Sequence, residues 1–197
     1  MTTRRAALGT MMLLVALMLA GCESAVAGSP RASSDRPDTA DSTSPSTSER
    51  LSPSVEKPKD LRGIDPCEFV TPEQRAELQL TAPDEKEMSP WGEQLCDLGG
   101  SVVGISFSPN TVLGDGLDRA YRSKNSFDNF AETNVDGYPG VRVNFATQSC
   151  ALIMGVSNEQ TLNMELTRVS ANAPGKGDPC GFAEEIMSEV IRNLPDA

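Results

Sequence analysis

The placement of the cysteines is the feature that most constrains how this chain can fold. Cys22 directly follows an apolar run, and Cys67, Cys96, Cys150 and Cys180 are spread over the rest of the chain. An even set of cysteines in an exported domain predicts two disulfides, which can be connected in three ways. We favour Cys67–Cys96 and Cys150–Cys180, because each pair joins the start of a predicted helix to a predicted strand. A four-cysteine metal site is the alternative, but the Cys-x-x-Cys spacing that many such sites use is absent from the sequence.

The N-terminal segment predicts export. Arg4 and Arg5 precede an apolar run over residues 6–20, which is shorter than the ~20 residues that a membrane-spanning helix needs. A charged start followed by a short apolar run is typical of a signal peptide, which the mature protein lacks. We therefore predict a signal peptide over residues 1–21. The paired arginines leave open whether the general or the twin-arginine export route is used.

The segment Leu19-Ala20-Gly21-Cys22 resembles the lipobox of bacterial lipoproteins. This resemblance implies that the chain is cut before Cys22, and that the Cys22 thiol carries a diacylglyceryl anchor with acyl chains such as palmitate. Two or more acyl chains are enough for stable attachment to a bilayer. The resemblance therefore implies a protein anchored to the cell membrane at its extracytoplasmic face. An ordinary signal peptide followed by an unmodified cysteine is the alternative.

Between Cys22 and residue 60, the composition predicts a disordered tether. Serine, threonine and proline supply nearly half of residues 23–60, and only Val26, Leu51 and Val55 are large and apolar. Such a segment cannot bury enough apolar surface to offset the entropy lost on ordering. We therefore assign residues 22–60 to the lipidated cysteine and its tether.

The charge and the residue types exclude several classes of function. The net charge is −11, and it becomes −13 once Arg4 and Arg5 leave with the signal peptide. Nucleic-acid binding needs a basic surface, so we predict no nucleic-acid partner. An anionic membrane surface would also repel the chain, so the acyl chains must hold it there. The absence of histidine excludes imidazole-based catalysis and histidine-bearing zinc sites.

Residues 61–197 predict a single α+β domain held by two disulfides. Asp65-Pro66 and Thr71-Pro72 each combine a capping side chain with a proline at the first helical position, and Asp178-Pro179 repeats this pattern. We predict helices over 72–80 and 116–124 and from 178 onward, a loop over 81–93, and an antiparallel sheet of about five strands packed with two or three helices. The alternating or continuously apolar segments that predict strands are 94–98, 102–108, 127–135, 141–146, 150–157 and 162–167.

Several of these motifs together resemble a known family. They are the lipobox, the Ser/Pro-rich tether, Asp65-Pro66-Cys67-x-Phe69-Val70-Thr71-Pro72-Glu73-Gln74, Cys96, Cys150, and Asp178-Pro179-Cys180 with a helix that ends at Leu194-Pro195. In this combination the chain resembles the actinobacterial lipoproteins called domain of unknown function 3558. The resemblance implies export, anchoring and the disulfide frame, and it implies no activity. The chain departs from the family in lacking an aromatic residue just after Cys96.

Few residues suggest chemistry. Trp91 and Tyr138 are the candidate contact residues, because each lies among glycine and proline in a predicted loop or turn. Each also has a structural explanation, a plug at the edge of the core for Trp91 and a plain turn for Tyr138. Glu184 and its acidic neighbours on the last helix are expected to face solvent. The sequence predicts no catalytic residue, metal site or cofactor.

Three classes of function follow from these observations. The favoured one is an exported, lipid-anchored envelope protein that binds another protein or a wall component without catalysis. The alternatives are a carrier of a small molecule or lipid and an enzyme that works without histidine. Ala151, Ile153, Gly155 and Gly104 would supply small or apolar groups for a carrier's pocket, although helix packing over the same sheet face would explain them equally well.

Overall fold

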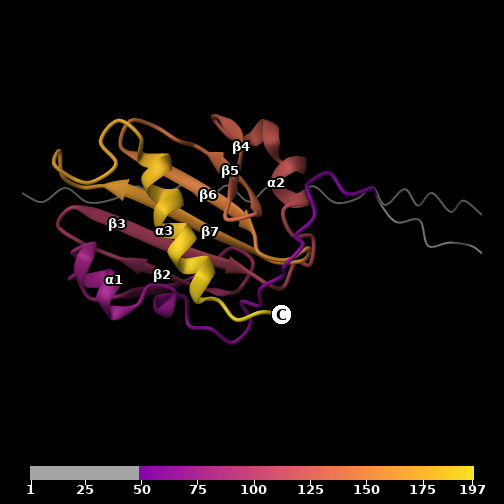
Figure 1. Ribbon diagram of the computed structural model, residues 1–197, viewed down its shortest axis with the longest axis horizontal. Coiled ribbons are helices and arrows are strands. Elements are labelled where there is room, and N and C mark those ends of the chain that lie inside the picture. The colour runs from indigo at the N-terminus through magenta and orange to yellow at the C-terminus, as the bar shows by residue number, and fades with distance from the viewer. Residues whose placement is uncertain (1–48) are drawn as a thin grey trace, which may run out of the picture. The chain divides into compact units, whose positions relative to one another are not determined.

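A seven-stranded antiparallel sheet organises the part of the chain that the structure describes (Figure 1). The computed structural model describes residues 49–197, so the predicted signal peptide, Cys22 and the tether as far as residue 48 lie outside it. The strands follow the order β1-β2-β3-β7-β6-β5-β4 across the sheet. Their bounds are Glu85–Met88 (β1), Gln94–Leu98 (β2), Val103–Asn110 (β3), Phe130–Val135 (β4), Tyr138–Val143 (β5), Ser149–Gly155 (β6) and Thr161–Arg168 (β7).

The α+β class is confirmed, but the prediction of about five strands was wrong. The sheet gains β1 at one edge, where the sequence predicted a loop over 81–93. All four residues of β1 are exposed, so the strand has no buried alternation that a sequence pattern could reveal. Pairing with β2 defines β1 instead: Lys86 lies opposite Cys96, and Met88 lies opposite Gln94.

The helices begin where the capping motifs predict. The short helix η1 (Pro66–Glu68) follows Asp65, whose carboxylate accepts a hydrogen bond from the Cys67 amide. A capping box between Thr71 and Gln74 starts α1 (Pro72–Glu77). Asp178 accepts a hydrogen bond from the Gly181 amide and caps the long helix α3 (Pro179–Asn193). The chain between β3 and β4 contains α2 (Asp118–Arg122) and η2 (Lys124–Ser126).

The main core lies between α3 and one face of the sheet. Successive strand residues point to opposite faces, so alternate residues of β3, β6 and β7 line this face. Burying an aliphatic side chain of this size contributes about 1.5–3 kcal/mol, so this layer provides most of the domain's stability. The buried side chains here include Ile105, Phe107, Leu152, Met154, Leu162, Met164 and Leu166 from the sheet, with Met187, Val190 and Ile191 from α3.

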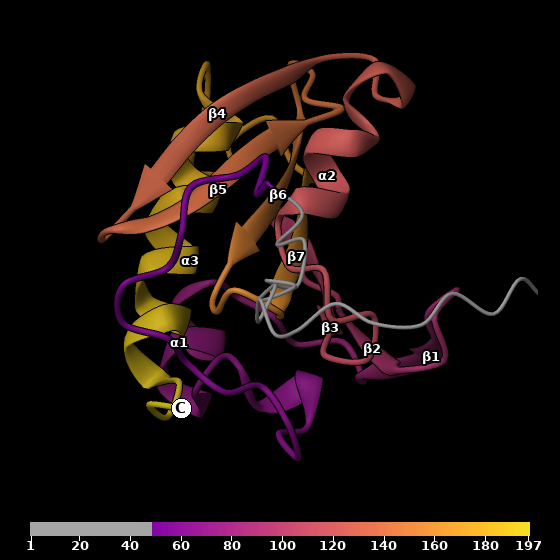
Figure 2. The ribbon, with the colours of Figure 1, turned by 90° about the vertical axis from the view of Figure 1, so that its right-hand side faces the viewer.

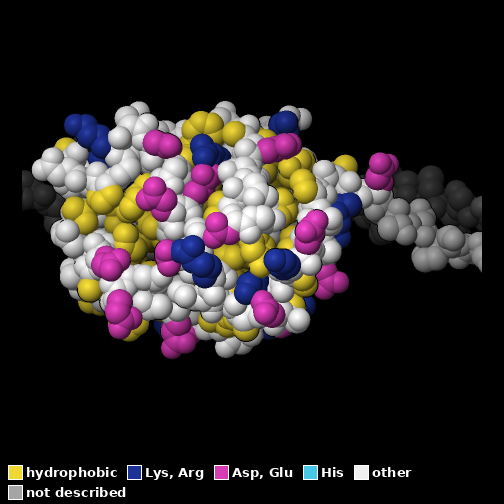
Figure 3. Space-filling view, in the orientation of Figure 1, with side chains coloured by type: hydrophobic (Ala, Val, Ile, Leu, Met, Phe, Trp, Pro, Cys, Tyr) yellow, Lys and Arg dark blue, Asp and Glu magenta, His cyan; other side chains and the backbone are white. Residues whose placement is uncertain are grey.

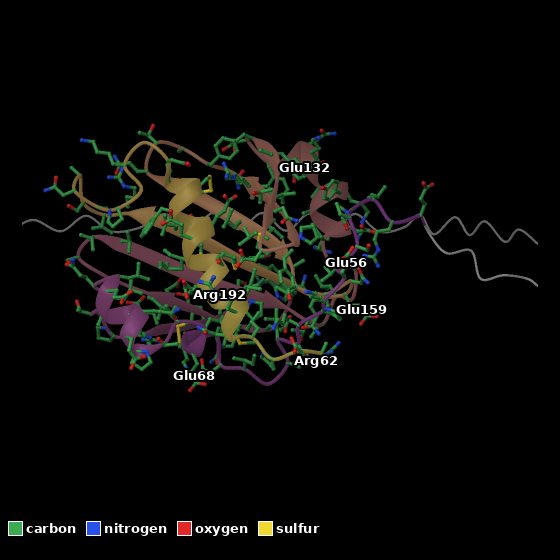
Figure 4. All side chains as sticks on the ribbon, viewed as in Figure 1. Glu56, Arg62, Glu68, Glu132, Glu159 and Arg192 are labelled. Carbon is green, nitrogen blue, oxygen red and sulfur yellow. A yellow bond between two sulfur atoms is a disulfide. The ribbon has the colours of Figure 1, made fainter. Side chains whose placement is uncertain are left out.

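Two disulfides fasten helices to this covered face (Figure 4). Cys67 at η1 is bonded to Cys96 in β2, and Cys150 in β6 is bonded to Cys180 in the first turn of α3. These are the two pairs that the sequence favoured. All four thiols are thereby used, so the alternative of a four-cysteine metal site is wrong.

Residues 50–60, which we call the N-terminal strap, pack against the domain, so the prediction that the disordered tether extends to residue 60 was wrong here. Both the amide and the hydroxyl of Ser52 donate to Asp118 Oδ1, at 2.8 and 2.6 Å, and the Val55 amide donates to Asn158 Oδ1 at 3.1 Å. Val55 is buried against the main core. The domain itself supplies these partners, and the composition of the strap cannot reveal them.

The second half of the strap is held by the ends of the strands. The Tyr138 hydroxyl donates to the Lys57 carbonyl at 2.8 Å, and the Lys59 amide donates to the Val156 carbonyl at 2.8 Å. Lys59 Nζ also lies 2.7 Å from the Asp196 carboxylate, whose hydrogen bond raises the pKa of Lys59. Tyr138 is therefore a buried residue that holds the strap, and the prediction that it is a contact residue in a surface turn was wrong.

Candidate functional site

The second face of the sheet is covered over only part of its width. Leu117 and Ala120 of the α2 segment pack on Val141 and Val143 of β5, with Ile153 of β6 beside them. Phe127 and Phe130 extend this small second core, in which Tyr121 meets Phe130 edge to face. Figure 2 shows α3 and α1 on one side of the sheet and α2 on the other. Ala151 and Ile153 both pack against this second core, and Ile153 also lines a hollow described below.

Strands β3 and β7 leave a polar strip on the uncovered part of this face. We call Gly104, Ser106 and Ser108 of β3, together with Asn163, Glu165 and Thr167 of β7, the open strip. The register places Gly104 opposite Thr167, Ser106 opposite Glu165 and Ser108 opposite Asn163. The same strands bury Ile105, Phe107, Met164 and Leu166 on the other face. The open strip is therefore a continuous row of hydroxyl, amide and carboxylate groups backed by the main core.

A shallow hollow lies over one end of the open strip. It has a volume of about 400 Å³ and is lined by Gly104, Ser106, Glu165 and Thr167 of the strip, with Asp97 of β2 and Glu85 of β1 at its side. A Cβ atom built on Gly104 would meet only the Leu98 carbonyl, at 4.0 Å, so the space above this glycine is open. The hollow therefore exposes polar side chains on a rigid support.

A second hollow, which we call the Trp91 hollow, lies at the other end of the strip. It has a volume of about 210 Å³ and lies between the tip of the β1–β2 hairpin and α2. Trp91, Phe127 and Ile153 provide apolar walls, while Asn163 and Arg119 provide polar groups. A concave apolar site with a few polar groups is the usual form of a ligand pocket.

Trp91 is held in place by hydrogen bonds around the hairpin tip. Its indole Nε1 donates to the Pro109 carbonyl at 2.8 Å. The Glu93 carboxylate accepts from the amide and the hydroxyl of Thr111, at 2.8 and 2.7 Å, which ties the tip to the end of β3. Gly92 has a φ of +85°, a conformation that favours glycine, and it lets the tip turn directly after Trp91. The structure thus places this predicted contact residue, half-buried, in the wall of a hollow.

Two polar atoms at this end of the strip lack a hydrogen-bond partner. Asn163 Oδ1 and Ser108 Oγ are buried, and neither bonds to any described residue. Ser108 and Asn163 lie opposite each other in the register of β3 and β7. An unpartnered buried polar group costs about 1–3 kcal/mol, so such groups are rare and need an explanation.

The carboxylates on this face lack basic partners. The register places Glu85 and Glu87 of β1, Asp97 of β2 and Glu165 of β7 on one face. All ion pairs found among residues 49–197 use other carboxylates. The side with α3 is different, because acidic and basic side chains are mixed there (Figure 3).

On the α3 side, the charge of Glu184 is neutralised by an ion pair. Its carboxylate accepts two hydrogen bonds from the Arg142 guanidinium, both at 2.6 Å, and another from the Thr133 hydroxyl. The hydrogen bonds to Glu184 raise the pKa of Arg142. The prediction that Glu184 faces solvent was therefore wrong, because the second turn of α3 points this residue at Arg142 of β5. Its neighbours Glu185 and Glu189 are exposed as expected.

The described residues offer little support for a metal site. Cys67, Asp84 and Cys96 have potential ligand atoms within 4.8 Å of one another. Both cysteines are in a disulfide, so they provide no thiolate, and Asp84 binds Arg75 at 2.7 Å. This group is therefore explained by the disulfide and an adjacent ion pair.

Comparison with known proteins identifies the family. The chain matches the family described as "Protein of unknown function (DUF3558)" over residues 17–193, a range that includes Cys22 and all four bonded cysteines. The chain therefore belongs to the DUF3558 family, as its motifs predicted. No curated protein and no solved structure matches it. Over residues 49–197, no helix has the length and apolar character needed to cross a membrane.

Proposed function

We propose that this protein is a lipid-anchored protein of the cell envelope that binds a ligand on the open strip without catalysis. The apolar run and Leu19-Ala20-Gly21-Cys22 support export and anchoring through a diacylglyceryl group on Cys22. The protein would then sit at the extracytoplasmic face of the cell membrane. An oxidising compartment also suits the two disulfides.

The uncovered part of the sheet carries the binding proposal. An antiparallel sheet commonly leaves one face in water, so exposure alone does not indicate a ligand. The open strip differs from an ordinary solvated face, because it ends in a hollow with an aromatic wall and contains two unpartnered buried polar atoms. Such features are typical of a surface that another molecule completes.

The strip starts near the point where the tether would join the domain. Arg50, at the start of the strap, donates to the Asn158 carbonyl, and Gly116 in the wall of the Trp91 hollow lies against the same carbonyl. The 28 residues from Cys22 to Arg50 can span at most about 100 Å. A lipid anchor would therefore keep this end of the strip within that distance of the bilayer, where a wall component or an envelope protein could reach it.

Anchoring is tested by the mass of the mature protein purified from its own host. The expected N-terminal peptide begins at Cys22 and carries acyl chains, whereas a Cys22→Ala chain loses the acyl mass and leaves the membrane fraction. An unmodified Cys22 in the mature protein would refute this part of the proposal.

Binding on the strip is tested by photo-crosslinking in host cells. A photoreactive amino acid at Ser106 is compared with one at Glu189, which is exposed on α3 beside a hollow between α3 and α1, on the other side of the sheet (Figure 2). We expect a discrete adduct from position 106 and none of that mass from position 189. Equal labelling at both positions, or no adduct at 106, would refute binding at the strip.

A further inference from the structure

We infer that the open strip binds a saccharide chain, with one sugar ring seated in the Trp91 hollow. The inference rests on the proposed function and names the class of ligand. A sugar ring has an apolar face of C–H groups and a polar edge of hydroxyls. A site for it needs an aromatic or apolar wall beside groups that both donate and accept hydrogen bonds.

The Trp91 hollow provides both parts. Trp91, Phe127 and Ile153 form the apolar wall, and Asn163 lies among the polar groups that line the hollow. A side-chain amide offers two donors and one acceptor, which can pair with neighbouring hydroxyls of one ring. Asn163 Oδ1 is closed to solvent in the unbound domain and has no partner among the described residues, so a small rotation of this side chain as the ring enters would let a sugar hydroxyl satisfy it. Ligand binding would thereby remove a cost that the unbound domain bears.

The size of the hollow favours one ring. Its volume of about 210 Å³ is below the ~300–1,000 Å³ typical of pockets that enclose a drug-sized molecule. The rest of a longer ligand would therefore have to lie outside the hollow.

The open strip provides the path for the rest of the chain. Asn163 and Thr167 are four residues apart in β7, and they are therefore separated by about 13 Å along the strand. Between them the face presents Glu165 and, from β3, Ser106. The second hollow then begins over Gly104. Hydroxyl and carboxylate groups along this path can bind the hydroxyls of about two further rings.

The charge of the strip selects among saccharides. Glu85, Asp97 and Glu165 line the far hollow, and no ion pair among the described residues uses them. Like charges facing each other in an interface oppose binding. The strip should therefore prefer neutral or amine-bearing sugars to uronic acids. Arg119, the basic residue in the lining of the Trp91 hollow, is itself paired with Asp115 at 3.8 Å.

The backbone argues against a peptide strand as the occupant. Recognition by strand addition needs a free sheet edge, whose amide and carbonyl groups pair with the incoming peptide. β3 pairs with β2 and β7, and β7 pairs with β3 and β6, so both strands have their edges filled. The strip can therefore offer only side chains, which suits a ligand that is rich in hydroxyl groups.

The single tryptophan gives a direct test. Trp91 is the only tryptophan in the chain, so its fluorescence reports on the hollow without interference. The purified full chain in detergent is titrated with chitotriose and with maltotriose as neutral probes, and with trigalacturonate as the anionic comparator. We expect a saturable change in Trp91 emission with a neutral trimer, at a dissociation constant of about 1 mM or lower. We expect the affinity for trigalacturonate to be at least about tenfold weaker.

Two variants make the test specific. Asn163→Leu keeps a similar volume and removes the amide, and it should weaken binding of the neutral trimer about tenfold. Asn172→Leu makes the same change on an exposed loop, and its affinity should match that of the unaltered chain. Equal affinities in the two variants, or an unchanged Trp91 emission with both neutral trimers, would overturn the inference.

The outcome separates this inference from the proposed function. If the trimers fail to bind while position 106 still gives its discrete crosslink, the strip binds a ligand of another class, and only the saccharide assignment fails. If both experiments fail, the proposed function fails as well.

Discussion

The two faces of this sheet are built from the same strands but differ in how they are covered: the main core lies under α3 on one face, whereas the small second core under α2 covers only part of the other. On the covered face, Phe107 and Met164 are fully buried beneath η1 and α3. On the open face, their neighbours Ser108 and Asn163 contain buried polar atoms that bond to no residue in the described part of the chain. The period of two in a strand permits this separation. The comparison teaches that one strand can hold the fold together with one set of side chains and present a binding surface with the other.

Charge follows the same division. On the α3 side, Arg142 pairs with Glu184, and Arg192 pairs with both Asp136 and Glu189. On the open face, the carboxylates of Glu85 and Glu165 lie outside all the ion pairs found among residues 49–197. The α3 side therefore carries the paired charges, and the open face carries carboxylates that, within the described part of the chain, are free to bind another molecule. The following predictions test that division, from the largest expected effect to the smallest.

Reduction of both disulfides should have the largest effect, because both fasten helices to the covered face. Their partners are 29 and 30 residues apart, so the chain-entropy model assigns about 3–4 kcal/mol to each. The total is comparable with the ~5–15 kcal/mol that stabilises a whole domain. Thermal melts followed by circular dichroism should shift down by about 20 °C or more in reductant. Unchanged melts of a chain whose four thiols are shown to be free would contradict this prediction.

Truncation of two neighbouring residues in β7 should show that the two faces contribute differently to the free energy of unfolding. Met164→Ala removes a buried side chain from the main core and should lower the free energy of unfolding by about 2–5 kcal/mol. Asn163→Ala, one residue earlier on the open face, should change it by less than about 0.5 kcal/mol or raise it, because it removes an unpartnered polar group. Denaturant unfolding measures both variants, and losses of similar size would contradict the division.

Removing a contact of the strap should have an intermediate effect on the free energy of unfolding. Asp118→Ala removes the acceptor for both the amide and the hydroxyl of Ser52 and should cost about 1–3 kcal/mol. Hydrogen exchange of the amides in residues 51–55 should speed up, while exchange in β6 and β7 changes little. Unaltered exchange in the strap would show that Asp118 does not hold it.

The strap should also loosen in acid. Burial alone would raise the pKa of Asp118, but hydrogen bonds from Ser52 and Leu51 outweigh it, and the pKa is lowered from 3.8. Because the folded-state pKa is depressed, the stabilisation is present above the ordinary value and is lost as pH falls through the lowered one. The protection of the strap amides, measured as the intrinsic exchange rate at each pH divided by the observed rate, should therefore fall below about pH 4. The Asp118→Asn chain should lack this acid-dependent step, and a step of equal size in that variant would assign it to another group.

The smallest effect on stability should come from the acidic open face. Glu165→Gln removes one exposed carboxylate that forms no ion pair with residues 49–197, and it should change the free energy of unfolding by less than about 0.5 kcal/mol. The same change should narrow the preference for neutral over anionic trimers, since it removes a repulsive charge. Denaturant unfolding and the Trp91 titration measure the two effects on one variant.

The sequence predicted local features well. Side-chain alternation in residues 102–108 correctly separated Ile105 and Phe107 from Ser106 and Ser108. Capping motifs located the starts of η1, α1 and α3, and the pairing of helix starts with strands gave both disulfides. These features depend on residues close together in the chain or on a strong periodic pattern.

Features that depend on distant partners could not be predicted. The residues of Glu85–Met88 show no pattern that predicts a strand, because this strand is defined only by its pairing with β2. The strap gives no signal because its partners, such as Asp118 and Asn158, lie more than 60 residues away. The open strip is defined by where α2 stops covering the sheet, and no local pattern encodes that limit. Trp91 was singled out in advance through its place beside Pro90 and Gly92 in a predicted loop, and Gly104 and Ile153 only as possible pocket residues of a carrier.

One variant tests the central claim that stability and binding belong to opposite faces of the sheet. In the Asn163→Leu chain, both the free energy of unfolding and the crosslink from position 106 are measured. We predict that the free energy of unfolding stays within about 0.5 kcal/mol of that of the unaltered chain, or rises, while the yield of the discrete adduct falls about tenfold. An adduct of undiminished yield, or a loss of more than about 2 kcal/mol in stability, would contradict the claim.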